Sequence, residues 1–299
     1  MFNRVVICGA AGQLGHELSL VFEAAGCQVL RQVRAQLDLT NAPLVERTLA
    51  AFEPELVINS AAYNMVDVAE QEPQAAYQVN ALAVRNLAVA CRQLDARLVH
   101  FSTDYVFDGR KSSPYVEVDA PGPINVYGRS KLAGERAVAA GNRRHIIVRT
   151  SWVYSPWRKN FVKTILRLAG ERDQLRIVAD QRGCPTAACD VAAACLQTAM
   201  RCVLDSKRVI FGTYHYAGLG EATWCEFART IVNLAGNRLA RSPEIVAIPT
   251  TAHPTLAARP PDTRLDCTAI VQAFGVKLHP WRESLANTID ELLTEKDVA

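Results

Sequence analysis

The chain has 299 residues, of which 49% are hydrophobic and 21% are charged, and its formal net charge is +3. This balance predicts a globular protein with a sizeable core, and a small net charge without a basic run argues against nucleic-acid binding. No apolar run approaches the roughly 20 residues that cross a membrane, and the N-terminus lacks a signal-peptide layout. We therefore expect a cytoplasmic protein that does not bind membranes.

The nine cysteines are an odd number for a disulfide framework. Four of them lie in stretches rich in Ala, Val and Leu, where a thiol behaves as a small core residue: Cys8, Cys91, Cys195 and Cys202. Cys184 and Cys189 are close in sequence, but no CxxC pair or histidine spacing indicates zinc. We expect reduced structural thiols.

The first 150 residues alternate strand and helix signals, which predicts a parallel sheet covered on both faces. Short apolar, β-branched runs predict strands at 4–8, 28–30, 56–59, 97–101 and 145–149. The patterns between them predict helices at 12–25, 44–52, 75–94 and 127–140. The expected fold class is α/β, a Rossmann-type doubly wound parallel sheet.

After residue 150 the alternation becomes irregular. The patterns predict a loop at 152–160, a helix at 161–169, a turn at 181–186, an alanine-rich helix at 187–200 and an extended, proline-rich loop at 248–261. We expect a smaller C-terminal substrate-binding lobe made of residues 151–186 and 218–299. The cofactor-binding domain would be residues 1–150 with a returning helix and strand at about 187–217.

A glycine-rich turn, GAAGQLG, follows the first expected strand and opens the first expected helix. Glycines let the backbone approach a pyrophosphate, while the helix N-terminus offers unpaired N–H groups and the positive end of its dipole. The alternative is a tight turn whose small residues only serve packing. The βαβ context favours dinucleotide binding, with these candidate residues: Gly9, Gly12, Gln13, Leu14 and Gly15.

The end of the second strand distinguishes NAD from NADP, because an acid there binds the ribose hydroxyls whereas an arginine can accept a 2′-phosphate. This chain has Arg31 and Arg34 and no acid at that place. We take Arg31 as the better candidate and Arg34 as the alternative, against two solvated loop arginines. NADPH is favoured, and NADH remains an alternative cofactor.

Further cofactor contacts are expected along the same edge of the sheet. Asp38 and Leu39 are placed to meet the adenine ring, although Asp38 could instead cap the helix that begins near Pro43. Ala61 and its neighbour Ala62 follow the third strand and are small enough for the cofactor to pass close to the backbone.

Tyr127 and Lys131 stand four residues apart on an expected helix, so they share one face. A lysine ammonium beside the phenol would lower the pKa of Tyr127 and allow proton exchange near neutral pH. Ser102, Thr103 and Asp104 follow the fourth strand, where a hydroxyl could bond a substrate carbonyl oxygen; the alternative is that they only cap a turn.

These segments resemble the dTDP-4-dehydrorhamnose reductase family of the extended short-chain dehydrogenase/reductase superfamily. The resemblance extends from about residue 4 to about Trp281. It is carried by GAAGQLG, NSAAYNMVDVAE, STDYVFDG, NVYGRSKLAGE, RTSWVY and PTTAHPTLAARPPDTRL. The superfamily shares the glycine and YxxxK motifs, whereas RTSWVY and the proline-rich segment are narrower signals.

The resemblance implies roles for individual residues. Tyr127 would be the proton donor, Lys131 would hold the nicotinamide ribose, and Thr103 would complete the catalytic trio. Asp104 and Trp152 would contact the sugar nucleotide. Gly12, Gln13 and Leu14 would meet the pyrophosphate. The remaining implied cofactor contacts are Ala62, Tyr63, Asn64 and Ser102.

Some family members bridge a dimer through magnesium, at acids that correspond to Glu17 and Asp190. One of these positions is Asp rather than Glu here, and two surface acids are an equal alternative, so a homodimer and a magnesium ion both stay open. Relatives often have Thr at the position of Asn64 and an acid at that of Arg31. The second departure supports NADPH.

The resemblance implies NADPH-dependent reduction of the C4 keto group of dTDP-4-dehydro-β-L-rhamnose, a dTDP-sugar, to give dTDP-L-rhamnose. A dehydratase of this superfamily carries an Asp-Glu pair after Ser-Thr, whereas this chain has Asp104 and Tyr105. A reductase of a related dTDP-4-keto-6-deoxy sugar is an alternative. Another is an NADP-binding regulatory subunit without turnover, like those of methionine adenosyltransferase.

Overall fold

The structure is a computed structural model that describes residues 2–204 and 211–294. Its centre is a six-stranded sheet in the order β10-β5-β4-β3-β1-β2, in which every neighbouring pair is parallel. The strands are β1 (Arg4–Cys8), β2 (Gln28–Gln32), β3 (Leu56–Asn59), β4 (Arg97–Thr103), β5 (His145–Thr150) and β10 (Gly212–His215). The Val, Ile and Leu residues of the four inner strands, β1, β3, β4 and β5, are buried on both faces, as a covered parallel sheet requires.

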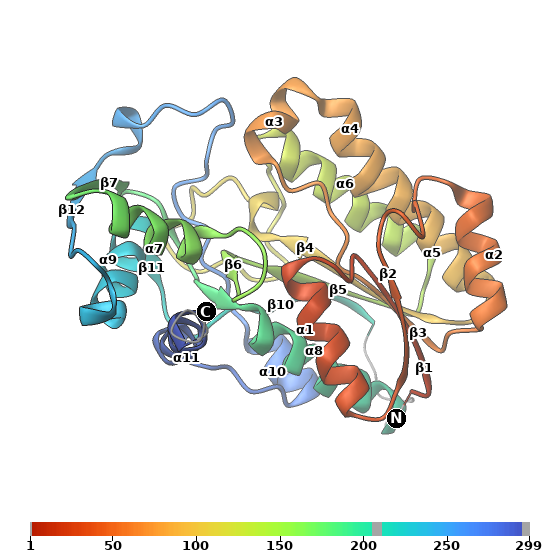
Figure 1. The fold of residues 1–299 in the computed structure, drawn as a ribbon. Coiled ribbons are helices and arrows are strands. Elements are labelled where there is room, and N and C mark those ends of the chain that lie inside the picture. Colours follow the sequence, from red (N-terminus) through yellow and green to blue (C-terminus); the bar gives the residue numbers. More distant parts are fainter. Residues whose placement is uncertain (1, 205–210, 295–299) are drawn as a thin grey trace.

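Helices cover both faces of this sheet (Figure 1). One layer contains α1 (Gln13–Ala24), α8 (Ala188–Leu204) and α10 (Thr268–Phe274), whose buried side chains share a core with one face. The other contains α2 (Ala42–Phe52), α5 (Ala83–Gln93) and α6 (Val126–Gly141). The expected Rossmann-type α/β fold is confirmed.

The position of β1 determines where this fold can bind a ligand. Its neighbours are β2 on one side and β3 on the other, so the chain leaves the sheet in opposite directions at the carboxyl ends of these strands. In doubly wound sheets the crevice at such a reversal is where nucleotides bind.

A second, smaller core lies beside the sheet. It is built by α7 (Phe161–Glu171), α9 (Trp224–Ala235), α11 (Trp281–Thr294) and the parallel pair β7 (Gln174–Val178) and β12 (Glu244–Ile248). Two short strand pairs lie on the segments that lead from the six-stranded sheet to this core and back. These are β6 (Val153–Tyr154) with β9 (Thr186–Ala187), and β8 (Arg182–Gly183) with β11 (Ala222–Thr223). Thr223 and Glu226 form a capping box that begins α9.

The helix expected at 75–94 is interrupted in the structure. The chain forms α3 (Val66–Gln71) and α4 (Pro73–Tyr77), passes through a π-helical turn at Gln78–Leu82 and continues as α5. Within this turn Asn80 is buried and bonds backbone and side-chain groups outside its own helix. Such turns are frequent at functional sites.

Other differences lie after residue 150. The loop expected at 152–160 and the turn expected at 181–186 contain the short strands β6, β8 and the start of β9. Neither the β7–β12 pair nor α9 was predicted. The expected unit at 187–217 supplies α8 and β10, but 205–210 lies outside the described residues, as do residues 1 and 295–299 of the expected units. Within the described residues, no helix is long and apolar enough to span a membrane.

All nine cysteines are free thiols, and all are buried except Cys189. Eight of the nine thus pack as core side chains, whereas Cys189 lies at the surface.

Two glycines provide a matched test of how closely α6 is packed. A Cβ atom at Gly134 would lie 2.1 Å from the backbone oxygen of Asn80, whereas one at Gly170 in α7 would meet nothing within 4 Å. We expect Gly134→Ala to lower the free energy of unfolding by about 3 kcal/mol or more. Gly170→Ala should raise it by up to about 1 kcal/mol, because alanine favours helix. Urea unfolding of both variants measures this, and equal stabilities would contradict the packing.

Candidate functional site

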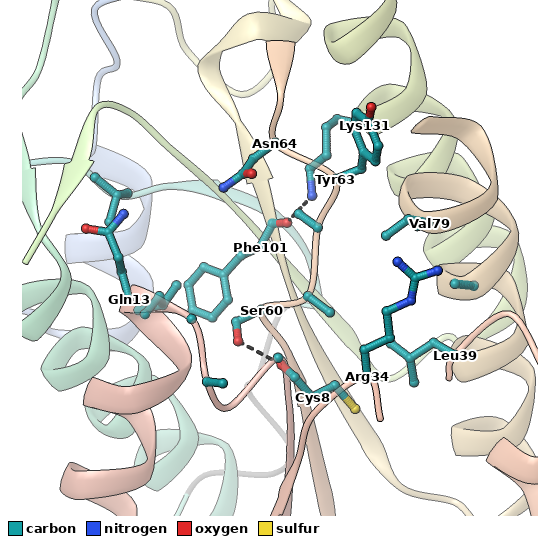
Figure 2. Close-up of a pocket in the computed structure, with 18 of the residues that line it drawn as sticks. Cys8, Gln13, Arg34, Leu39, Ser60, Tyr63, Asn64, Val79, Phe101 and Lys131 are labelled. Atoms are coloured by element: carbon teal, nitrogen blue, oxygen red, sulfur yellow. Dashed lines mark hydrogen bonds between the residues drawn. The ribbon is translucent and has the colours of Figure 1, made fainter. Parts of the chain in front are cut away.

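A cavity of about 710 Å³ lies at the carboxyl ends of the strands. Its walls include residues that end β1 and β2, the segment after β3, the end of β4 and the segment after β5. Figure 2 shows Gln13 and Arg34 on opposite sides of this cavity, with Phe101 between them and Lys131 above in the view. Most of the expected cofactor, catalytic and substrate residues therefore surround one space; Gly15 and Arg31 do not line it.

The glycine turn forms the floor of this cavity at the start of α1. Gly9 has φ +79°, and a Cβ there would lie 2.7 Å from the backbone nitrogen of Ala61. Gly12, Gln13 and Leu14 also line the cavity. Gly15 has a different position: its Cβ would lie 2.1 Å from the oxygen of Gly9, so it lets the helix pack behind the turn. We correct its expected role from cofactor contact to support.

The two arginines at the end of β2 differ in their surroundings. Arg34 lines the cavity together with Asp38 and Leu39. Arg31 donates from Nε to Glu23 Oε1 at 2.7 Å and also pairs with Glu23 Oε2, on the exposed surface of α1. Arg31, the expected first candidate for a 2′-phosphate, therefore does not line the cavity, whereas Arg34, the alternative, does.

The loop after β2 is held by side chains. Asp38 Oδ1 accepts hydrogen bonds from the backbone nitrogen and the hydroxyl of Thr40, at 2.9 and 2.8 Å, and these bonds lower the pKa of Asp38. Asn41, and not Asp38, caps α2 by accepting from Leu44. Asn86 donates to the oxygen of Leu39 at 3.1 Å. These bonds fix the backbone that faces the cavity.

Thr103, Tyr127 and Lys131 all line the cavity, from β4 and α6. Thr103 Oγ1 donates to Asp104 Oδ1 at 3.0 Å. Lys131 Nζ donates to the backbone oxygen of Phe101 at 2.7 Å, as the dashed line in Figure 2 shows. A hydroxyl, a phenol and an amine thus converge at the edge of the sheet.

Burial dominates the electrostatics of this group. It raises the pKa of Tyr127 to about 12, against the lowering effect of a hydrogen bond with Thr103. It also lowers the pKa of Lys131 to about 8, which the charge of Glu135 opposes. The expectation that Lys131 lowers the pKa of Tyr127 does not hold here, because burial raises the pKa of the phenol and Lys131 donates to the backbone oxygen of Phe101 instead. The phenol is therefore protonated at neutral pH.

Ser102 lines the cavity, but its hydroxyl points to a buried acid. It donates to Glu135 Oε1 at 2.5 Å. Arg149 binds the same carboxylate with two bonds, of 2.9 and 2.7 Å, and both ionic side chains are 5% exposed. The hydroxyl of Ser102 thus joins β4 to α6 and β5, and only its other atoms are available for the expected cofactor contact.

Sequence reasoning missed Asn80, which holds one wall of the cavity. Its side-chain oxygen accepts from the nitrogen of Tyr63 at 2.8 Å, and its amide donates to the oxygen of Tyr63 and the hydroxyl of Ser130, at 2.9 and 3.0 Å. The segment it fixes lines the cavity: Ala61, Ala62, Tyr63 and Asn64. A polar residue inside an Ala- and Leu-rich pattern was the available signal.

Two residues extend the cavity towards the smaller core. Asp104 is 2% exposed and accepts from the hydroxyls of Thr103 and Ser151, each at 3.0 Å. Burial raises its pKa from 3.8 to about 6, although these hydrogen bonds act in the opposite direction. Trp152 has φ +45° and stacks on Trp224, with ring centroids 3.5 Å apart. Both Asp104 and Trp152 line the cavity.

The two acids considered for magnesium are bonded within the protein. Glu17 accepts from the indole nitrogen of Trp157 at 2.7 Å, and Asp190 accepts from the hydroxyl of Ser284 at 2.5 Å. Among residues 2–204 and 211–294, no three His, Cys, Asp or Glu side chains form a group that could hold a metal ion. We derive no reaction step through magnesium.

Comparison with known proteins supports this geometry. The family model described as the RmlD substrate binding domain matches residues 3–294. The dTDP-4-dehydrorhamnose reductase of Sinorhizobium fredii is 41% identical over 98% of each chain, and that of Escherichia coli K12 is 38% identical over 97% of this chain and 98% of its own.

Comparison with a solved structure also finds similarity to a dTDP-4-dehydrorhamnose reductase. The dTDP-4-dehydrorhamnose reductase of Bacillus anthracis, in complex with NADP, superposes with a TM-score of 0.88 at 37% identity, over 97% of this chain and all of that one. A family match over nearly the whole chain and these identities agree with the arrangement of Thr103, Tyr127 and Lys131 around one cavity. This chain therefore belongs to the RmlD family of dTDP-4-dehydrorhamnose reductases.

Proposed function

We propose that this protein reduces the C4 keto group of dTDP-4-dehydro-β-L-rhamnose to give dTDP-L-rhamnose, with NADPH as cofactor. The main support is one observation: Thr103, Tyr127 and Lys131 line the same cavity as the glycine turn. The reductases of S. fredii and E. coli, and the NADP complex of the B. anthracis enzyme, support the same reaction.

The cofactor assignment fits the walls of the cavity. Glycine at position 9 leaves the turn open where a Cβ would collide with Ala61. The N-terminus of α1, which begins directly after Gly12, offers N–H groups to a pyrophosphate. Arg34, which lines the cavity together with Asp38, would bind the 2′-phosphate at the adenosine end. When bound at the other end, the reduced nicotinamide supplies the hydride.

Tyr127 would supply the proton. Its raised pKa keeps the phenol protonated at neutral pH, so it can donate to the C4 oxygen as negative charge develops there. The hydroxyl of Thr103 would orient that oxygen. With a pKa of about 8, Lys131 is mostly cationic at neutral pH and would stabilise the phenolate that results.

Asp104 and Trp152 would hold the sugar nucleotide. The carboxyl of Asp104 can accept from, or when protonated donate to, a sugar hydroxyl. The indole of Trp152, fixed by Trp224, offers an apolar face for packing. We propose further that the six-stranded sheet with its helices binds cofactor and that the smaller core around α7, α9 and α11 forms the substrate lobe. A cytoplasmic location and a homodimer stay predictions.

Product analysis tests the proposed reaction directly. Purified protein is incubated with NADPH and dTDP-4-dehydro-β-L-rhamnose, and the products are separated and identified by NMR. We expect one NADPH to be consumed for each dTDP-L-rhamnose formed. Faster reduction of another dTDP-4-keto-6-deoxy sugar would indicate the alternative substrate. NADP binding without any turnover would instead support the regulatory-subunit reading.

Removing the phenol tests the proton donor. We expect Tyr127→Phe to lower turnover by about 10²- to 10⁴-fold, because the general acid is lost, while the Kd for NADPH changes little. Tyr77→Phe on the exposed surface of α4 serves as the control and should keep native turnover. Near-native turnover in Tyr127→Phe would remove this residue from its role.

Arg31, within β2, and Arg34, just after it, give a matched test of cofactor selection. We expect Arg34→Ala to raise the Kd for NADPH about tenfold or more without raising that for NADH, because only NADPH carries the 2′-phosphate. Arg31→Ala, which removes the partner of Glu23, should leave both affinities close to native. Calorimetric titration measures both Kd values. If only Arg31→Ala lost affinity for NADPH, Arg31 and not Arg34 would be the residue that binds the 2′-phosphate.

The raised pKa of Asp104 predicts how stability depends on pH. Its carboxyl binds a proton more tightly in the folded than in the unfolded chain, so its stabilising contribution is complete below pH 3.8 and is lost as the pH rises to about 6. Relative to Asp104→Asn, the native protein should lose about 2 kcal/mol of unfolding free energy between pH 4 and 7. Urea unfolding across this range measures the difference. If the unfolding free energies of the two proteins changed with pH in parallel, the prediction would be wrong.

A further inference from the structure

A short segment after β6 lies across the glycine turn. We call residues 155–160 the strap. Its contacts begin at Gln13, whose side-chain oxygen accepts from the hydroxyl of Ser155 at 3.0 Å and from Nδ2 of Asn160 at 2.8 Å. Trp157 bonds Glu17 from its indole nitrogen. The strap is thus fixed both to the turn and to the first residues of α1.

Asn160 also gives the strap a fixed end. Its side-chain oxygen caps α7 by accepting from the nitrogen of Lys163 at 3.1 Å, while its amide group donates to Gln13 and to the oxygen of Ser155. One side chain therefore joins the first helix of the smaller core to the glycine turn.

The strap contributes two of the cations that line the cavity. Arg34 lies at the end with Asp38, and Lys131 is buried at the end with Phe101, to whose oxygen it is bonded. The other two lining cations, Arg158 and Lys159, are exposed residues of the strap.

Arg158 is held directly against the turn. Its Nε donates to the backbone oxygen of Ala11 at 2.7 Å. Its backbone has φ +59°, a left-handed conformation that residues other than glycine rarely adopt. An exposed arginine in an unfavourable backbone conformation, bonded to the turn, points to a role for its side chain rather than for the shape of the loop.

We propose that Arg158 and Lys159 bind the pyrophosphate of the cofactor from the side opposite the N-terminus of α1. The inference rests on the proposed function and deepens it. The N–H groups at the start of α1 supply hydrogen bonds, and the strap supplies the compensating positive charge, since the cations at the two ends of the cavity face other parts of the dinucleotide. A guanidinium already bonded to Ala11 is well placed for a phosphate above Gly12.

A diphosphate could also belong to the dTDP-sugar. The contact with Ala11 favours the cofactor, because that residue lies within the turn that opens α1. The experiment below distinguishes the two sources.

The test uses Arg158→Gly, because glycine accepts the left-handed conformation and removes only the side chain. The control is Arg167→Ala, which removes an exposed arginine from α7, where it pairs with Glu171. Calorimetric titration with NADP⁺ should show a Kd raised about tenfold in Arg158→Gly and unchanged in the control. The Tm of Arg158→Gly should be no lower than native.

Comparing the binding of NADP⁺, 2′-AMP and dTDP shows which part of which ligand Arg158 contacts. Arg158→Gly should weaken NADP⁺ but neither 2′-AMP, which lacks the pyrophosphate, nor dTDP. Arg34→Ala should weaken both NADP⁺ and 2′-AMP. The native Kd for NADP⁺ should also rise more steeply with salt than that of Arg158→Gly, because a charge contact has been removed.

Several results would overturn the inference. These are an unchanged NADP⁺ affinity in Arg158→Gly, equal weakening in Arg167→Ala, or weakening of dTDP alone. If the glycine variant melts below native, Lys159→Ala decides by the same titrations. Native protein that binds no NADP⁺ would refute the proposed function itself, whereas native binding with an unaffected variant refutes only the role of the strap.

Discussion

The close approach of α6 to the sheet edge and to the π turn is the constraint on which the catalytic geometry depends. Two glycines permit it: a Cβ at Gly128 would lie 2.1 Å from the oxygen of Tyr105, and one at Gly134 equally close to the oxygen of Asn80. The buried pair of Glu135 and Arg149 then joins the helix to β5. Tyr127 and Lys131 are brought to the mouth of the cavity because this helix has no freedom to move away.

The same close packing determines the protonation of the site. Burial shifts the pKa of each group towards its neutral form, upward for Tyr127 and Asp104 and downward for Lys131. A protonated phenol suits a donor in ketone reduction. An amine close to its titration point is sensitive to a nearby charge, so Glu135, one turn further along α6, helps to keep Lys131 cationic. The ion pair with Arg149 therefore has an electrostatic consequence as well as a structural one.

Sequence was sufficient for features whose signal is local. Gly9 and Gly12 follow a strand and open a helix, and Tyr127 and Lys131 share a helix face, so chain spacing alone places them. Which of Arg31 and Arg34 is the better candidate for the 2′-phosphate depends on Glu23. This acid lies on a neighbouring helix and forms an ion pair with Arg31. No spacing rule contains that contact.

The features that escaped prediction are those made by contacts distant in sequence. The residues of the π turn have the apolar pattern of an ordinary helix, and only the partners of Asn80, in the segment after β3 and on α6, explain the irregularity. The stack of Trp152 on Trp224 joins residues more than 70 positions apart. The proline-rich segment at 248–261 was expected to be an extended loop, but it contains a 3-10 helix at Thr250–Ala252. Its docking was not expected either: Arg259 binds Asp67 with two bonds of 2.7 Å.

The strap links the two cores at the wall of the cavity. In a simple division, one core binds cofactor and the other binds substrate, but Gln13 is bonded to Ser155 and Asn160, and Arg158 to Ala11. The wall of the cofactor cavity is therefore completed by residues that lead into α7. Any displacement of the smaller core would move this wall, and filling the cavity would in turn restrain that core. Cofactor and sugar nucleotide would then bind to a surface that neither core forms alone.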